Sequence, residues 1–202
     1  RAVGELAHRR DEINALNVFP VPDSDTGSNM AHTMEAAVAE LDNGGDVADS
    51  LAFGAVRGAR GNSGMVLSQV LRGVAESTVD SVIDGDVFVR SLKQAVELVD
   101  RAIAEPVEGT VITVLKAASE SAEDAEAQSG ATLHSIVSAA ITAARMALER
   151  TPSQLPALRE AGVVDAGGAG LVILLESLLA EVEGSTGNTG CLLYTSPSPR
   201  DR

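Results

Sequence analysis

Apolar residues recur at every third or fourth position along almost the whole chain, which is the period of an amphipathic α-helix. The clearest stripe lies within 133–148 and runs through Leu133, Ile136, Ala140, Ala144 and Leu148. Comparable faces occupy seven further stretches: 3–16, 30–41, 47–55, 66–74, 92–103, 111–122 and 171–182. The segment VITVL (111–115) resembles a strand in isolation, but helical spacing continues past it into KAASESA. The pattern therefore predicts an all-α bundle of about eight helices.

The chain shows no pattern typical of secretion or membrane insertion. Its opening segment, RAVGELAHRR, is charged and lacks the apolar core of a signal peptide. Because it also lacks an initiator Met, we expect the sequence to begin inside a longer protein. The most apolar stretch, GLVILLESLLA (170–180), is too short for a bilayer span and contains Glu176. We therefore predict a soluble protein with no membrane span.

Composition narrows the class of partner. Aromatic residues make up only 2% of the 202 residues, and 19 are glycine, which favours closely packed helices over a β-sandwich. A net charge of −14 disfavours nucleic acid and anionic membrane surfaces as partners, because both attract basic proteins. Cys191 is the only cysteine, so one chain has no disulfide framework and no thiolate metal site. A cytoplasmic location fits best.

The character of the sequence changes near residue 184. From there STGNTGCLLYTSPSPR shows no apolar period, and CLLYTSPSPRDR resembles the translation of a sequencing adapter. We therefore expect one domain over 1–183. Residues 184–202 are expected to be a disordered, non-native tail that packs against nothing.

The first segment with candidate chemistry is NVFPVPDSDTGSN (17–29). Asp23 and Asp25 stand two residues apart in a turn that two prolines stiffen, just before Ser28 is expected to cap a helix. Two carboxylates this close repel each other unless a cation or a proton lies between them. Mg²⁺ binds one or two carboxylates together with water and phosphate oxygens, and Asn17 offers a further oxygen. The alternative is a helix cap in which both aspartates accept backbone N–H groups.

Two glycine-rich segments indicate phosphate binding. In RGARGNSG (57–64), glycines allow close backbone approach, Arg57 and Arg60 add positive charge, and Asn62 or Ser63 is expected to cap the next helix. The segment is not a Walker A loop, and a tight turn between helices is the alternative. In VVDAGGAG (163–170), Asp165 precedes a glycine cluster, where it either lines a nucleotide or serves as an N-cap. The same two interpretations hold for Thr110.

Together these motifs resemble a known family. NALNVFPVPDSDTGSNM, GARGNSGMVLSQVLRG, PVEGTVITVLKAASE and AGVVDAGGAGLV follow, in order and spacing, the nucleotide-binding domain of bacterial fatty-acid kinase. That domain is similar to the DhaL subunit of dihydroxyacetone kinase. The resemblance covers about residues 1–183. It implies an eight-helix antiparallel barrel whose loops hold ATP and two Mg²⁺ ions at one end.

The resemblance also assigns roles to individual residues. Three aspartates bind the metals in DhaL. Asp23 and Asp25 match two of them, and Asn17 stands near the first of the three, one residue out of step. By holding the metals, Asp23 and Asp25 would carry the catalytic role. The residues expected at the phosphates are Thr26, Asn29, Gly61, Asn62, Ser63 and Gly64. Those expected around the nucleotide are Thr110, Asp165, Ala166 and Gly167.

The implied activity is transfer of the γ-phosphoryl group of ATP to a fatty-acid carboxylate on a DegV-like carrier protein, giving an acyl phosphate. One alternative is a DhaL-type subunit that phosphorylates dihydroxyacetone. Thr26, where DhaL has His, and the FPVP insertion argue against it. Another is a nucleotide-binding module without transfer activity. The sequence leaves open whether the full-length protein forms a homodimer.

Two departures from the family bear on activity. The fatty-acid kinase loop usually reads PDGDTG, whereas Ser24 stands here between the aspartates. If that position needs a positive φ, serine strains the loop by about 1 kcal/mol. Full-length members also carry a middle region and a DegV-like end after this domain. We therefore expect this chain to be incomplete for catalysis.

Overall fold

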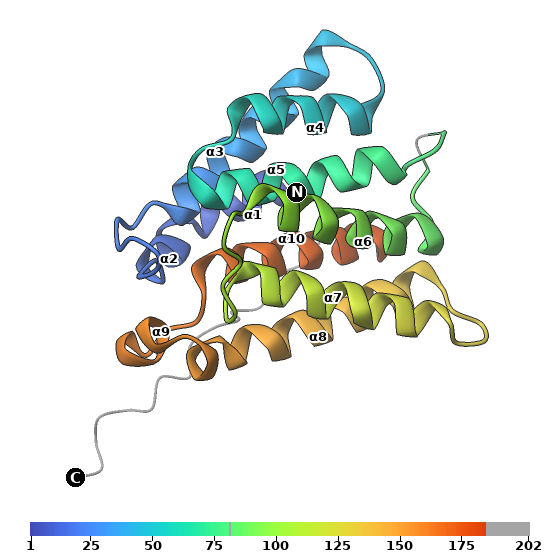
Figure 1. Cartoon of the computed structure of the whole chain (residues 1–202). Coiled ribbons are helices and arrows are strands. Elements are labelled where there is room, and N and C mark those ends of the chain that lie inside the picture. Colours follow the sequence, from blue (N-terminus) through green and yellow to red (C-terminus); the bar gives the residue numbers. More distant parts are fainter. Residues whose placement is uncertain (81, 185–202) are drawn as a thin grey trace.

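The computed structural model describes residues 1–80 and 82–184. The predicted disordered tail lies outside these residues from position 185 onward. The described part is all-α (Figure 1). Its helices are α1 (Ala2–His8), α2 (Arg10–Ala15), α3 (Thr26–Ala39), η1 (Glu40–Asn43), α4 (Val47–Gly58), α5 (Gly61–Ser77), α6 (Gly85–Ala102), α7 (Val111–Glu126), α8 (Leu133–Gln154), α9 (Pro156–Ala161) and α10 (Ala166–Val182).

The predicted fold class is confirmed. Helices α1 and α2 share the predicted opening stretch, and α9 is a short addition, so about eight main helices remain. Within the described residues, the β-type pairing is limited to an isolated bridge between Val79 and Val82. Residues 111–115 belong to α7, as their spacing indicated.

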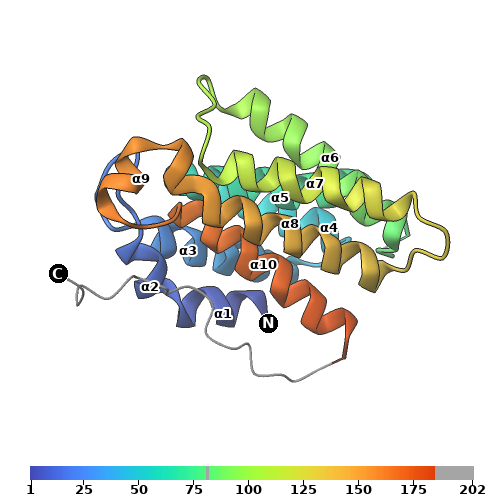
Figure 2. The ribbon, with the colours of Figure 1, turned by 90° about the horizontal axis from the view of Figure 1, so that it is seen from below.

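The helices close into a ring. Helices α3, α5, α6, α7, α8 and α10 each contact the next, and α10 returns to α3. Helix α4 packs outside the ring on α3 and α5, while α1 and α2 pack on α3 and α10 (Figure 2). Alanine fills many of the contacts: Ala95, Ala118, Ala122, Ala140 and Ala144 are completely buried. Small side chains thus allow the close helix packing that the composition indicated.

Helix α10 is buried on nearly every side. The single apolar face predicted within 171–182 is too narrow. Leu174 and Leu178 pack partly buried against the core, and Val172, Ile173 and Glu176 are buried as well. A helix surrounded by others needs an apolar surface all round, so no single face stands out in its sequence. Glu176 is accommodated by Arg145 of α8, whose Nε and Nη2 donate to its Oε1 at 2.9 and 2.7 Å.

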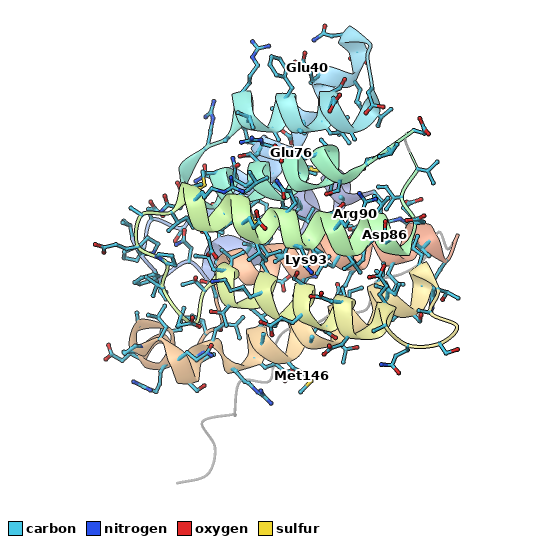
Figure 3. All side chains as sticks on the ribbon, turned by 45° about the vertical axis from the view of Figure 1, so that its right-hand side comes forward. Glu40, Glu76, Asp86, Arg90, Lys93 and Met146 are labelled. Atoms are coloured by element: carbon cyan, nitrogen blue, oxygen red, sulfur yellow. The ribbon has the colours of Figure 1, made fainter. Side chains whose placement is uncertain are left out.

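The outer surface carries paired charges. On α6, Arg90 pairs with Asp86 at 2.9 Å, and Lys93 reaches Glu123 of α7 at 2.6 Å (Figure 3). These groups are exposed, so the pairs contribute little to stability. No helix of residues 1–80 and 82–184 is long and apolar enough to cross a membrane.

The ring brings the functional segments to one end. The connections α2–α3, α4–α5, α6–α7 and α9–α10 all lie at the left of Figure 1. Consequently α3, α5, α7 and α10 all begin at this end of the barrel. Four helix N-termini at one end of a barrel favour the binding of an anion there.

Candidate functional site

A cavity of about 540 Å³ opens at this end of the barrel. Ten of the thirteen predicted site residues line it: Asn17, Asp23, Asp25, Thr26, Gly61, Asn62, Ser63, Thr110, Asp165 and Gly167. The other three, Asn29, Gly64 and Ala166, do not line it. Residues from four connections separated by up to 150 positions thus surround one space.

The aspartate loop (residues 17–25) lines the cavity, and the carboxylates of Asp23 and Asp25 make no hydrogen bond within the described residues. Asp23 is exposed and Asp25 half-buried, and neither side chain hydrogen-bonds a backbone N–H within the described residues. Asp25 is the N-cap residue of α3 by position, yet its side chain makes no capping bond. The expected Ser28 cap is wrong, because α3 begins at Thr26 and Ser28 lies inside its first turn.

Ser24, between the two aspartates, has φ +56°. This left-handed conformation costs an L-residue about 1–2 kcal/mol, and glycine adopts it without that cost. The conditional expectation from the sequence is therefore met, since the position needs a positive φ. The loop that holds the two carboxylates carries backbone strain.

Both polar atoms of the Asn17 side chain make hydrogen bonds within the protein. It is 5% exposed, and its Oδ1 accepts the N–H groups of Asp25 at 3.0 Å and Thr26 at 3.1 Å. Its Nδ2 donates to the carbonyl oxygen of Val21 at 3.0 Å. An amide oxygen has two lone pairs, and both are engaged here. Asn17 lines the cavity but holds the loop backbone together.

The second segment is shorter as a loop than its glycines suggested. Helix α4 continues to Gly58 and α5 begins at Gly61, so the predicted cap by Asn62 or Ser63 is wrong. Both residues lie in the first turn of α5, where they line the cavity. Gly61 has φ +59°, and a Cβ there would lie 2.7 Å from Nδ2 of Asn29. A side chain at Gly61 would thus displace Asn29.

The two arginines of this segment do not line the cavity. Arg57 lies over the Phe53 ring at 5.5 Å from its centroid, and its Nη1 is 3.6 Å from Oε2 of Glu40, which lies beside α4 (Figure 3). No Lys or Arg is among the residues that line the cavity, so helix N-termini are the groups there that favour an anion.

Asp165 and Thr110 occupy the far wall. Asp165 is the N-cap of α10, as one of the two sequence interpretations had it, and its Oδ2 accepts the Gly168 N–H at 2.7 Å. Burial raises its pKa to about 6, although backbone N–H groups of Gly168, Val111 and Gly167 act in the opposite direction. Thr110 is the N-cap of α7, and its hydroxyl donates to the carbonyl oxygen of Val107.

One wall of the cavity was missed by the sequence analysis. It is apolar and comes from the α2–α3 and α6–α7 connections: Phe19, Pro20, Val21, Ala102, Ile103, Ala104, Val107 and Ile112. Helix α6 ends at Ala102, four residues before Pro106. The apolar residues flanking that proline were the available signal, because a purely connecting loop has little need of them.

The carboxylates suit a divalent cation that is also bound by phosphate. Within the described residues, no group of three or more His, Cys, Asp or Glu side chains could hold a metal by itself. The carboxylates of Asp23 and Asp25, which make no hydrogen bond, lie beside the first turns of α3 and α5. This donor set fits Mg²⁺, which uses one or two carboxylates and completes its octahedron with water and substrate phosphate oxygens.

Comparisons with known proteins find similar proteins for most of this chain. Residues 20–180 match the family described as the DAK2 domain. The chain is 39% identical to Protein YloV of Bacillus subtilis and 37% identical to the uncharacterized protein SSP1546 of Staphylococcus saprophyticus, each over 90% of this chain and 34% of the relative. It thus spans about a third of these relatives. The crystal structure of the dihydroxyacetone kinase of C. freundii superposes with a TM-score of 0.64 at 20% identity, over 89% of this chain and 33% of that one.

Proposed function

The chain belongs to the DAK2 domain family, and on that premise we propose that it is the ATP-binding part of a fatty-acid kinase. The reaction passes the γ-phosphoryl group of ATP to a carboxylate oxygen of a fatty acid held by a DegV-like carrier protein. The bond between the γ-phosphorus and the β,γ-bridging oxygen breaks, and the products are ADP and an acyl phosphate. The observation that carries the proposal is the cavity of about 540 Å³, which ten of the thirteen residues predicted from the sequence line together.

The phosphate end of ATP would lie over α3 and α5. Gly61, Asn62 and Ser63 form the first turn of α5, where no side-chain cap takes up the backbone N–H groups, so these groups are available to the triphosphate. Thr26 opens α3 on the other flank, although its own N–H is already bonded to Asn17 Oδ1. Asp23 and Asp25 would hold two Mg²⁺ ions against the phosphate oxygens. Bound Mg²⁺ neutralises the charge that develops on the phosphoryl oxygens. The two aspartates therefore set where the γ-phosphate stands.

The base end of ATP would lie against the apolar wall. Ile103, Val107 and Ile112 offer a surface that suits the flat face of a purine. Thr110 and Asp165 stand at the same wall and supply its polar groups. This orientation points the γ-phosphate toward the aspartate loop.

The acceptor would come from outside the chain. Transfer between ATP and a carboxylate needs positioning and charge neutralisation, and no nucleophile of the protein. Thr26 supports a fatty-acid acceptor over dihydroxyacetone, since it replaces the histidine that DhaL carries at this position. A carrier protein that docks at the cavity mouth would present the carboxylate in line with the γ-phosphate.

Thermal unfolding with and without Mg²⁺–ATP tests the binding step. A ligand at one hundred times its Kd stabilises the folded protein by about 2.7 kcal/mol, so Tm should rise by several degrees. The shift should require Mg²⁺ and disappear in Asp23→Ala and Asp25→Ala, whose helical circular dichroism should be unchanged. Absence of any shift in the unmodified chain would refute the proposal.

The acceptor is tested by three parallel incubations with Mg²⁺–ATP. One contains a fatty-acid-loaded DegV-like carrier, one contains dihydroxyacetone, and one has no acceptor. We expect acyl phosphate only with the carrier, when the rest of a full-length relative is also supplied. Phosphorylated dihydroxyacetone would instead assign a DhaL-type activity, and binding without transfer in all three would leave a nucleotide-binding module.

A further inference from the structure

Two asparagines at the end of α2 hold the first turn of α3 from outside. Asn14 Oδ1 accepts the Ser28 N–H at 3.1 Å, and Asn14 Nδ2 lies 3.0 Å from the Ser28 hydroxyl oxygen. Three residues further on, Asn17 Oδ1 accepts the N–H groups of Asp25 and Thr26. Side chains of another segment thus bind N–H groups that a helix usually satisfies with its own N-cap side chain.

The comparison with other helices of this chain shows what the arrangement changes. Asp46, Asp84 and Asp165 are also N-cap residues, and each carboxylate accepts N–H groups of its own helix. All three have extended backbone, with ψ of 138°, −170° and 126°. Asp25 has ψ −4° and makes no such bond. Among the aspartate N-caps of the described helices, Asp25 alone keeps its carboxylate out of the cap.

A glycine lets the asparagines come close enough. Gly27, in the first turn of α3, faces α2, where an added Cβ would collide with the carbonyl oxygen of Arg10. The same Cβ would lie 3.0 Å from Asn14 Oδ1 and from Ile13 Cβ. Any side chain at Gly27 would therefore separate α2 from α3 and break the contact between Asn14 and Ser28.

We propose that Asn14 and Asn17 are positioning residues that cap α3 from outside and thereby leave the Asp25 carboxylate free for the metal. Asn17 then acts through the loop backbone and is not itself a metal ligand, because both lone pairs of its oxygen are occupied. This inference rests on the proposed function, since a free carboxylate matters only where a cation is bound. It extends that function by naming what holds the loop ready.

The test measures binding of Mn²⁺, as a paramagnetic substitute for Mg²⁺, to the folded chain with a non-hydrolysable ATP analogue, by electron paramagnetic resonance. In Asn14→Ala the Ser28 N–H loses its acceptor, and Asp25, three residues earlier, is the ordinary replacement. We expect Mn²⁺ affinity to fall at least tenfold. Asn14→Asp keeps an acceptor for Ser28 and should stay within about threefold of the unmodified chain. If Asn14→Ala does not fold, Asn14→Gln replaces it in this test, because the longer side chain moves the amide away from the Ser28 N–H. The same loss of Mn²⁺ affinity is expected for that variant.

Asn17→Asp separates positioning from direct ligation. The aspartate cannot donate to the Val21 carbonyl oxygen, so a positioning role predicts weaker Mn²⁺ binding. If residue 17 were a direct metal ligand, the added negative charge of aspartate would tighten Mn²⁺ binding. Tighter Mn²⁺ binding in Asn17→Asp would therefore overturn our assignment of Asn17 as a positioning residue. Asp84→Ala is the matched control, because it removes the cap of α6 at the opposite end of the barrel and should leave Mn²⁺ affinity unchanged.

The outcomes distinguish this inference from the proposed function. If the unmodified chain binds no Mn²⁺ with the nucleotide, the proposed function fails and this inference fails with it. If the unmodified chain binds and Asn14→Ala binds equally well, the positioning role alone is overturned. Lower stability in Asn14→Ala with unchanged Mn²⁺ affinity would show a purely structural cap and would overturn it as well.

Discussion

Replacement of Ser24 by glycine should stabilise the protein, although no contact is added. Ser24 is exposed, its side chain makes no hydrogen bond in the described structure, and its φ is +56°. Relief of the left-handed conformation is worth about 1–2 kcal/mol. The greater freedom of glycine in the unfolded chain offsets about 0.5–1 kcal/mol of that gain. The net expectation is about 0.5–1 kcal/mol.

For a chain of this length, that change raises Tm by about 2 °C, which calorimetry or circular dichroism resolves. Ser24→Ala keeps the strain and loses only the hydroxyl group, so its Tm should equal that of the unmodified chain. Asp80 has φ +54° far from the cavity, and Asp80→Gly is the matched control for glycine at a positive φ. Its gain should be smaller, because aspartate tolerates this conformation better than serine.

The same three variants test whether the strain matters to the site. If the loop is held by Asn17, relief of strain at Ser24 should leave Mg²⁺–ATP binding the same or tighter, and Asp80→Gly should not change it. A fall in Tm for Ser24→Gly, or a Tm loss of several degrees for Ser24→Ala, would refute the reasoning. Either result would mean that the serine hydroxyl makes a stabilising contact that outweighs the backbone cost.

Three further expectations follow from the structure. Burial raises the pKa of Asp165 to about 6 from an ordinary 3.8, so the folded state favours the protonated acid. Protonation of Asp165 therefore stabilises the fold fully below pH 3.8, and this stabilisation is lost as the pH rises through 6. Chemical denaturation at pH 4.5 and 7.5 should show the free energy of unfolding decline by about 2–3 kcal/mol at most. Asp165→Asn should lack this decline, and the same pH dependence in both proteins would contradict the assignment to Asp165. Arg145→Met should destabilise by about 1–3 kcal/mol in urea because it leaves Glu176 buried without its partner, whereas Lys93→Met, at an exposed pair, should cause no measurable change. Finally, this chain alone should form acyl phosphate about a hundredfold more slowly than a fusion of the chain to the remaining two thirds of YloV. The rate is measured with radiolabelled ATP, and equal rates would place the whole mechanism within these residues.

The helical fold could be predicted because most helices present one apolar face. Helix α10 was predicted as well, but one apolar face describes it incompletely, because it is buried on nearly all sides. The candidate site could be located because glycines, aspartates and asparagines cluster before helix starts. Its apolar wall around Ile103 and Val107 was missed, because the apolar residues beside Pro106 are few and follow no regular period.

Capping was the least predictable feature. Ser28, Asn62 and Ser63 are all good N-cap residues by type, and none of them caps. Which residue caps depends on where the helix begins, and in α3 that is fixed by Asn14 and Asn17 from a neighbouring segment. A short-range sequence rule cannot see such a partner. Asp165 was predicted correctly as one alternative because its cap bond, to Gly168, is local.

The central place of α10 has a consequence for biosynthesis. This helix comes last in the described chain, yet it completes the ring by contacting α8 on one side and α1 and α3 on the other. Its end meets the first residue, where Arg1 Nε lies 2.6 Å from Oε1 of Glu181. During translation the earlier helices therefore leave the ribosome with their inner faces uncovered. The barrel, and with it the wall that holds Asp165 and Gly167, can close only after residue 182 has emerged, so the nascent domain is exposed to aggregation and proteolysis until then.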